Sequence, residues 1–256
     1  METVFVGPAP RLALSVAGSG PLLLFIHGVG GNRHHWDEQV RFFSQSFKAT
    51  AWDARGYGDS EDYEGPLKFE DDFSADILRV LSHFEAKKAH LVGLSMGGRI
   101  VRNFALRHPE RLHSITLANT SAGIDAMTPE QVARFVEERR NRTPETMRAL
   151  IGSKARPEAM QVLQQSVKGL HKPMYLKTLE AIVAQDHRAP VEKIRVPTLV
   201  IAGDEDRVYP KGSTRNLAER IPGAQFVEFE GCGHLSNLEQ PERFNATLLD
   251  FLRRCT

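Results

Sequence analysis

The chain has 256 residues, of which 33 are Lys or Arg and 32 are Asp or Glu, so that its formal net charge is +1. Hydrophobic residues make up 41% and charged residues 25%, as in an ordinary globular protein that is large enough to bury a core without disulfides. The near-neutral charge gives no overall electrostatic reason to expect nucleic acid or an anionic membrane as a partner.

The N-terminal stretch METVFVGPAPRL lacks the basic and apolar regions of a signal peptide. No apolar run approaches the roughly 20 residues that a membrane-spanning helix needs. The two cysteines, Cys232 and Cys255, have neither CxxC nor zinc-site spacing, so no disulfide framework is expected. These features favour a cytoplasmic location.

Short apolar runs alternate with amphipathic helical patterns along the chain. The first run alternates polar and apolar residues like a half-buried antiparallel strand, whereas the run LLLFI is continuously apolar, like a strand covered on both faces. The predicted strands cover residues 11–17, 22–26, 47–52, 89–94, 112–118, 197–203 and 224–230. The predicted helices cover residues 70–84, 98–108, 212–221 and 241–255. This alternation predicts an α/β protein with a mostly parallel central sheet flanked by helices.

Residues 121–190 break the alternation, because they contain several short amphipathic pieces and no convincing strand. Four prolines stand near the starts of these pieces, where a missing N–H group costs little: Pro129, Pro144, Pro157 and Pro173. The stretch is too long for ordinary crossover helices and predicts a helical cap, or lid, over the strand ends. The core domain is then expected to consist of residues 1–120 and 191–256.

The pentapeptide GLSMG around Ser95 fits the pattern Gly-x-Ser-x-Gly, which arises easily by chance in a chain with 20 glycines. Its context is more specific, since a predicted strand ends just before it and a predicted helix follows. Small residues at Gly93 and Gly97 permit the tight turn, which pushes the serine hydroxyl out at the carboxyl end of the sheet. The sequence therefore predicts that Ser95 is a catalytic nucleophile.

A serine nucleophile needs a base, and His234 is the best candidate among the 10 histidines. It follows the strand predicted over residues 224–230 through a glycine-bearing loop and precedes the last helix. His27 is expected to be a structural hydrogen-bonding residue rather than a base. Four other histidines are expected on surfaces or helix ends: His83, His90, His108 and His113.

The acid that orients the histidine is expected in the loop GDEDRVYP, which follows the strand predicted over residues 197–203. Asp204 comes directly after a glycine and so lies within the turn itself. Asp206 lies further into the loop, closer to the reach of a distant histidine, and is preferred. The chain order Ser95, Asp206, His234 matches the serine–acid–histidine order of α/β-hydrolases, and each residue follows a predicted strand.

A tetrahedral intermediate also needs N–H donors at its oxygen. One candidate is the backbone N–H of Met96, directly after the nucleophile. The other is Val29, in the glycine-rich loop HGVGGN that follows the strand LLLFI and precedes a helical pattern.

Taken together, these pieces closely resemble the α/β-hydrolase family over essentially the whole chain. The matching stretches are HGVGGN (27–32), WDARGYGDS (52–60), GLSMGG (93–98), GDEDRVYP (203–210) and GHLSNLEQPERF (233–244). The resemblance implies that Asp206 is the triad acid, that Val29 and Met96 form the oxyanion hole, and that residues 121–190 form the lid.

Other residues in the matching stretches have structural interpretations. Asp53, Arg55 and Gly58 match the family and are interpreted as residues that lock a loop. Asp76, in the first predicted helix, is expected to be solvated or to cap the helix.

Within the family, PERLHSITLANTSAG and APVEKIRVPTLVIAGDEDRVYP look most like the 3-oxoadipate enol-lactonase and carboxylesterase branch. The resemblance implies hydrolysis of a small-molecule ester or lactone through an acyl-enzyme, without cofactor or metal. The alternatives are a carbon–carbon bond hydrolase, a cofactor-free perhydrolase and a hydrolase-fold receptor for a small molecule. The sequence leaves the acyl and alcohol specificity and the oligomeric state open.

Overall fold

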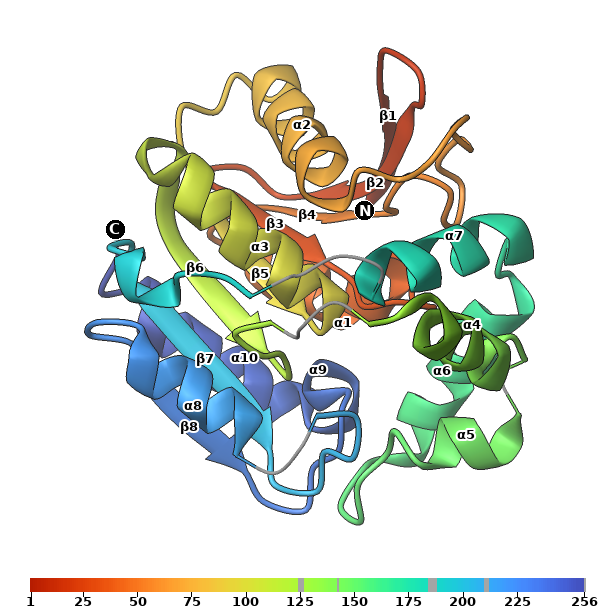
Figure 1. Cartoon of the computed structure of the whole chain (residues 1–256). Coiled ribbons are helices and arrows are strands. Elements are labelled where there is room, and N and C mark those ends of the chain that lie inside the picture. Colours follow the sequence, from red (N-terminus) through yellow and green to blue (C-terminus); the bar gives the residue numbers. More distant parts are fainter. Residues whose placement is uncertain (124–126, 142, 184–187, 210–211, 256) are drawn as a thin grey trace.

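The computed structural model describes residues 1–123, 127–141, 143–183, 188–209 and 212–255. Within these residues the chain forms an eight-stranded sheet in the order β1-β2-β4-β3-β5-β6-β7-β8 (Figure 1). β2 is antiparallel to β1 and β4, and the remaining neighbours are parallel. The predicted α/β class and mostly parallel sheet are confirmed.

Each predicted strand is present, with bounds that differ by no more than a residue. The strands are β2 (Leu12–Ala17), β3 (Leu22–Ile26), β4 (Lys48–Trp52), β5 (Ala89–Leu94), β6 (Leu112–Ala118), β7 (Thr198–Gly203) and β8 (Gln225–Phe229). One strand was not predicted, β1 (Glu2–Val6), which forms the sheet edge and is mostly exposed. β3, β5 and β7 are buried along their whole length, and β6 is buried at every position except His113, as strands in a covered parallel sheet should be.

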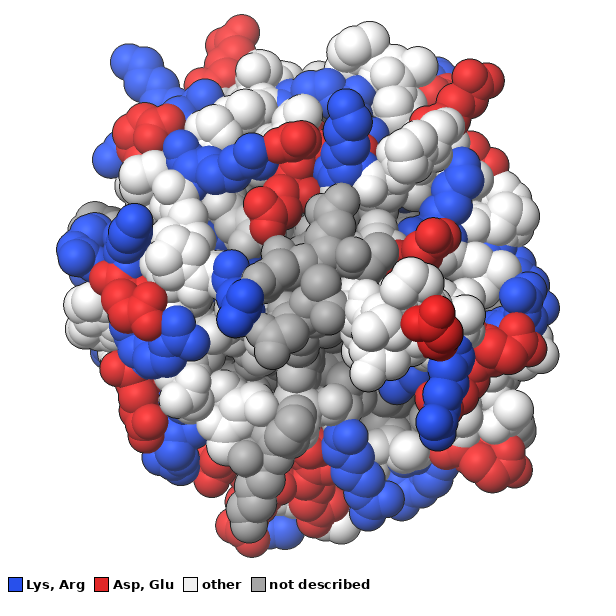
Figure 2. Space-filling view, in the orientation of Figure 1, with Lys and Arg blue, Asp and Glu red and all other residues white. Residues whose placement is uncertain are grey.

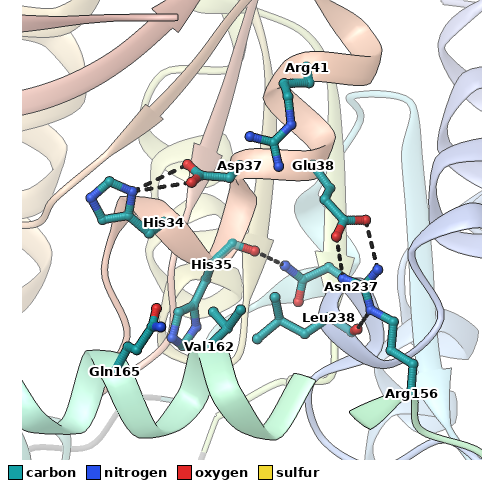
Figure 3. Close-up of a pocket in the computed structure, with 10 residues that line it drawn as sticks. All are labelled: His34, His35, Asp37, Glu38, Arg41, Arg156, Val162, Gln165, Asn237 and Leu238. Carbon is teal, nitrogen blue, oxygen red and sulfur yellow. Dashed lines mark hydrogen bonds and ion pairs between the residues drawn. The ribbon is translucent and has the colours of Figure 1, made fainter. Parts of the chain in front are cut away.

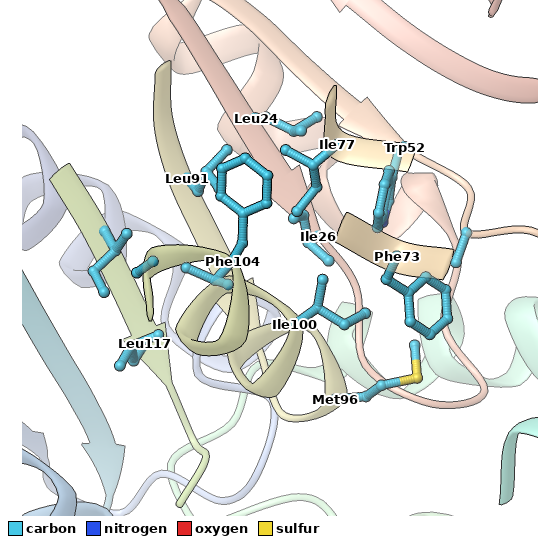
Figure 4. Close-up of a cluster of buried hydrophobic side chains, with 14 of the residues drawn as sticks. Leu24, Ile26, Trp52, Phe73, Ile77, Leu91, Met96, Ile100, Phe104 and Leu117 are labelled. Carbon is cyan, nitrogen blue, oxygen red and sulfur yellow. The ribbon is translucent and has the colours of Figure 1, made fainter. Parts of the chain in front are cut away.

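Helices cover both faces of the sheet (Figure 1). One face carries α2 (Phe69–His83), α3 (Met96–Arg107) and α8 (Ser213–Arg220), and the other carries α1 (Asp37–Phe43) and α10 (Pro241–Leu252). Because helices pack on both faces, the buried hydrophobic residues form two clusters, one on each side of the sheet. Figure 4 shows the first cluster, in which Trp52, Phe73 and Phe104 pack with Leu24 and Leu91 between the sheet and the helices.

The stretch between β6 and β7 contains helices and no strand among its described residues. They are α4 (Pro129–Arg139), α5 (Pro144–Arg148), α6 (Pro157–Lys168) and α7 (Lys172–Val183). Three of them begin at the prolines that the sequence marked, and Pro173 is the second residue of α7. In Figure 1 these helices gather beside the sheet rather than on either face of it.

The surface carries both signs of charge. On the face shown in Figure 2, Lys and Arg side chains are interspersed with Asp and Glu, without a large patch of one sign. Among the helices of the described residues, none combines the length and the apolar character that crossing a membrane would need.

Candidate active site

Ser95 occupies a sharp turn between β5 and α3. Its φ of 57° lies in the left-handed region, which costs a non-glycine residue about 1–3 kcal/mol and is typical of functional sites. The turn is closed by glycines: a Cβ at Gly93 would lie 2.2 Å from the Gly97 carbonyl oxygen, and a Cβ at Gly97 would lie 2.1 Å from that of Ile26. The backbone therefore fits the strand–turn–helix context that the sequence predicts for a nucleophile.

Asp206 and His234 come together from two neighbouring strand ends. The loop after β7 brings Asp206 Oδ2 to 2.9 Å from His234 Nδ1, and both side chains are more than nine-tenths buried. The carboxylate accepts only, so Nδ1 carries the proton in this hydrogen bond, and in the neutral form of the ring the lone pair is on Nε2. Asp204 makes a different contact, accepting from the Cys232 N–H at 3.3 Å.

The environment of Asp206 favours its ionised form. Burial by itself would raise the pKa of Asp206, but the charge and hydrogen bond of His234 and the donors from Val208 and Asn119 lower it below its ordinary value. The Val208 N–H donates to Oδ1 at 2.8 Å, and Asn119 Nδ2 donates to Oδ2 at 3.2 Å. The carboxylate is thus a fixed negative charge beside the imidazole.

The end of β6 links Ser95 to the Asp206–His234 pair. The Ser95 N–H donates to Ala118 O at 2.9 Å, and Thr120 Oγ1 donates to Ser95 O at 2.9 Å. Between these two residues, Asn119 contacts Asp206. No hydrogen bond joins the Ser95 hydroxyl to His234 within the described part of the chain. Such bonds are often long before substrate binds.

The two N–H groups predicted to bind an oxyanion make no hydrogen bond within the described part of the chain. Within the described ranges, neither the Val29 N–H nor the Met96 N–H donates to a protein acceptor. Met96 is the first residue of α3, where N–H groups lack intrahelical partners. The Val29 loop passes close to Ser95, since a Cβ at Gly28 would lie 3.1 Å from Ser95 Cβ.

His27 holds this loop, as expected of a structural histidine. Its Nε2 accepts the Ala54 N–H at 3.0 Å and its Nδ1 donates to Gly28 O at 2.8 Å. Burial lowers the pKa of His27, although the Gly28 carbonyl and Asp53 oppose the shift, and keeps the ring neutral.

The interpretation of Asp53, Arg55 and Gly58 as structural residues is confirmed. Asp53 is fully buried and accepts the Arg33 N–H at 2.7 Å. A Cβ at Gly58 would lie 2.2 Å from its carboxylate. Arg55 donates to both oxygens of Asp76, at 2.7 and 2.8 Å.

Two predictions about single residues are wrong. Asp76 is neither solvated nor a helix cap, because it is fully buried and paired with Arg55 and Arg79. His90 does not lie on the surface: it is 1% exposed within β5, where Nδ1 lies 2.8 Å from Ser114 Oγ. The sequence signal for Asp76 is the arginine at position 55, which the family-like stretch WDARGYGDS places after β4.

A cavity of about 330 Å³ lies away from these residues, between α6, α9 (Ser236–Glu239), α1 and the short 3₁₀ helix η1 (Arg33–Trp36). Figure 3 shows its charged lining, in which His34 faces Asp37 and Arg156 faces Glu38. None of the predicted catalytic or oxyanion residues lines it. Among the described residues, no group of three or more His, Cys, Asp or Glu side chains is arranged to hold a metal ion.

Comparison with known proteins agrees with this geometry. Residues 21–241 match the family described as the alpha/beta hydrolase fold. The chain belongs to the α/β-hydrolase family. It is 30% identical to a 3-oxoadipate enol-lactonase of Acinetobacter baylyi, over 96% of this chain and 95% of that protein. It is also 30% identical to a 2-hydroxy-6-oxononadienedioate/2-hydroxy-6-oxononatrienedioate hydrolase of Paraburkholderia phymatum, over 96% and 92%.

A solved structure gives the same result. A thermophilic esterase from Thermogutta terrifontis superposes with a TM-score of 0.87 at 27% identity, covering 100% of this chain and 99% of that one. The predicted family, with its resemblance to enol-lactonases, is confirmed. The chain is a hydrolase of the α/β fold, and the names of its relatives differ from one another in substrate.

Proposed function

We propose that the protein is a serine hydrolase that cleaves carboxylic esters or lactones through an acyl-enzyme. His234 Nε2 takes the proton of Ser95 Oγ as the oxygen attacks the substrate carbonyl. The Val29 and Met96 N–H groups hold the oxyanion, and His234 then gives its proton to the leaving alkoxide. Water attacks the acyl-enzyme with His234 again as base, and Ser95 is regenerated as the acid leaves.

The observation that carries the proposal is the 2.9 Å hydrogen bond between His234 Nδ1 and Asp206 Oδ2. It fixes the tautomer in which Nε2 accepts a proton, and it places a negative charge where the imidazolium will form. A buried aspartate that only oriented a loop would have no need of a histidine partner. The strained turn at Ser95 and the two unused N–H donors support the same reaction.

We also propose the domain division, with residues 121–190 as the cap and residues 1–120 and 191–256 as the core. Helices α4 to α7 fill that stretch, and its chain meets the loop of the proposed base, since the His234 N–H donates to Leu150 O at 2.8 Å. A cap in this position would set which acyl and alcohol groups reach Ser95.

The relatives support an ester or a lactone as the bond that is cleaved, because they include an enol-lactonase and an esterase. A second candidate is cleavage of a carbon–carbon bond in a vinylogous diketone, which the relative from Paraburkholderia phymatum favours. Both reactions would use the same nucleophile, base and oxyanion donors.

A substrate panel separates the two. Purified protein is assayed with p-nitrophenyl acetate and butyrate, with an enol-lactone, and with a meta-cleavage product, each beside the Ser95→Ala variant. The proposal predicts turnover of esters or the lactone that Ser95→Ala abolishes. Turnover of the meta-cleavage product alone would favour the second candidate, and full ester hydrolysis by Ser95→Ala would refute both.

A further inference from the structure

Glu239, the last residue of α9, is a buried carboxylate that the proposed reaction does not use. It is 2% exposed, and both of its oxygens accept backbone hydrogen bonds. Oε2 accepts the N–H groups of Gly152 and Gly233, each at 2.8 Å, and Oε1 accepts the N–H of Leu235 at 2.8 Å. Burial raises the pKa of Glu239, and the three backbone N–H groups together with His234 oppose that shift. A carboxylate that only accepts, from three donors, has the hydrogen-bonding pattern of the ionised form.

The three donors lie at two functionally important places. Gly233 and Leu235 flank His234, and the N–H of His234 itself donates to Leu150 O at 2.8 Å. Three successive N–H groups around the proposed base are therefore all held. Gly152, the third donor to Glu239, lies in the turn between α5 and α6, within the proposed cap.

The cap turn and the histidine loop touch without spare room. A Cβ at Gly152 would lie 2.5 Å from the Gly233 nitrogen, and a Cβ at Gly233 would lie 2.5 Å from Leu150 O. These distances are far below ordinary contact, so the two backbones depend on glycine at both positions. Glu239 Oε2 joins the two backbones here, because it accepts the N–H groups of both Gly152 and Gly233.

Helix α9, which carries Glu239, is itself anchored on several sides. Ser236 Oγ donates to Asn119 Oδ1 at 2.6 Å, next to Asp206. Asn237 Nδ2 donates to His35 O at 2.7 Å, and Arg156 Nε donates to Leu238 O at 2.9 Å (Figure 3). The helix that carries the Glu239 carboxylate is therefore held in place by hydrogen bonds.

We propose that Glu239 is a positioning residue for His234, which it holds through the peptide groups on either side, and that it ties the cap turn at residues 150–152 to this loop. The inference rests on the proposed role of His234 as base. Among the described residues, the titratable groups that face His234 are the Asp206 carboxylate, the Tyr209 ring at 5.9 Å between centroids and, across the loop backbone, Glu239. The negative charge of Glu239 adds to that of Asp206 in favouring the imidazolium.

The test compares Glu239→Gln with Glu239→Asp and with Glu242→Gln, which removes an exposed carboxylate three residues away. In Glu239→Gln an amide N–H₂ replaces one acceptor, so at least one loop N–H loses its partner. We expect kcat to fall by roughly 100-fold with little change in KM, because a small misplacement of a catalytic group has this effect. We also expect the acid limb of the kcat/KM profile to move to lower pH, since a charge that favours imidazolium is gone. Glu242→Gln should match the wild type.

Glu239→Asp keeps the charge and shortens the side chain by one methylene. In this variant the acid limb of the kcat/KM profile should stay in place and kcat should fall by roughly tenfold. Glu239→Asp also serves as the test if circular dichroism shows that Glu239→Gln does not fold. Wild-type kcat in either folded variant would overturn the proposal, as would an unmoved acid limb in folded Glu239→Gln. Assays of Ser95→Ala and His234→Ala run alongside: if both retain full activity, the proposed function itself has failed.

Discussion

Asn119 Nδ2 donates to Asp206 Oδ2 at 3.2 Å and to the Gly233 carbonyl at 3.0 Å, so that a single amide joins the proposed acid to the loop of the proposed base. Asn119 is fully buried and directly follows β6, the strand beside Ser95. Its φ of 48° lies in the left-handed region, which Asn tolerates better than most residues. The sequence indicates only that this strand end carries no acid, and the role of the amide follows from the structure.

Removal of this amide should slow the reaction without preventing substrate binding. Asn119→Gly deletes the side chain, and glycine adopts the positive φ without strain. We expect kcat to fall by roughly tenfold with little change in KM, as for the loss of one hydrogen bond to a charged group at about 1.5 kcal/mol. Steady-state kinetics with an ester substrate measures both constants. An unchanged kcat would show that Asp206 and His234 do not need this support.

Asp206 and Asp204 should behave differently when each is replaced by Asn. Asp206→Asn keeps the shape of the side chain but favours the wrong histidine tautomer, so kcat should fall by roughly 10⁴-fold, as in serine-protease triads. Asp204→Asn alters a residue whose contact is the Cys232 N–H, and it should retain most of the activity. The reverse order of effects in the same ester assay would identify Asp204 as the acid.

The turn at Ser95 should not accept a side chain at Gly97. A Cβ there would lie 2.1 Å from Ile26 O and 2.9 Å from His27 O, which are both backbone atoms. Gly97→Ala should lower the free energy of unfolding by about 3 kcal/mol, the upper part of the range for overpacked cores. Gly169→Ala is the matched control, because its Cβ would meet nothing nearer than 3.8 Å. Urea unfolding of both variants gives the comparison, and equal stabilities would contradict the packing described here.

The protein should lose stability below neutral pH because it buries neutral histidines. Burial, aided by neighbouring His27 and His34, lowers the pKa of His35 to about 3, and burial together with His113 lowers that of His90 to about 4. Above the ordinary histidine pKa both states are neutral and this stability is fully present. Below the ordinary histidine pKa the unfolded chain takes up a proton that the folded protein does not. The free energy of unfolding then falls by about 1.4 kcal/mol per pH unit for each of these histidines.

His35→Gln isolates one of these contributions. Its side chain lies next to Ser166 of α6, to which His35 Nε2 is hydrogen-bonded at 2.9 Å. Between about pH 7 and about pH 5, the wild type should lose about 2 kcal/mol more than this variant in urea unfolding. Identical pH dependence would mean that folding does not lower the pKa of His35.

The extent to which sequence predicts this structure depends on how local each signal is. The buried strands, Ser95 and the glycine turn around it are readable because neighbouring residues carry the information. β1 is not, since an exposed edge strand shows no burial pattern. His90 was misplaced because a hydrogen bond to Ser114 on the next strand compensates its burial.

Glu239 illustrates the remaining difficulty. In the sequence it stands in NLEQP, before a proline at the start of a helix, and nothing nearby distinguishes it from a solvated glutamate. One of its three hydrogen-bond donors is Gly152, which is 87 residues away. Only the fold brings these two backbones together, so the contact could not be predicted from periodicity or motif spacing.

The most direct test of the central claim, that Ser95 is the nucleophile, is covalent labelling with a fluorophosphonate followed by intact-mass and peptide mass spectrometry. We predict one phosphonyl adduct per chain, on the peptide that contains Ser95, and none in Ser95→Ala, which should also lose ester hydrolysis. The contradicting result is an adduct of equal extent in Ser95→Ala, or a wild-type protein that hydrolyses esters at full rate while it remains unlabelled.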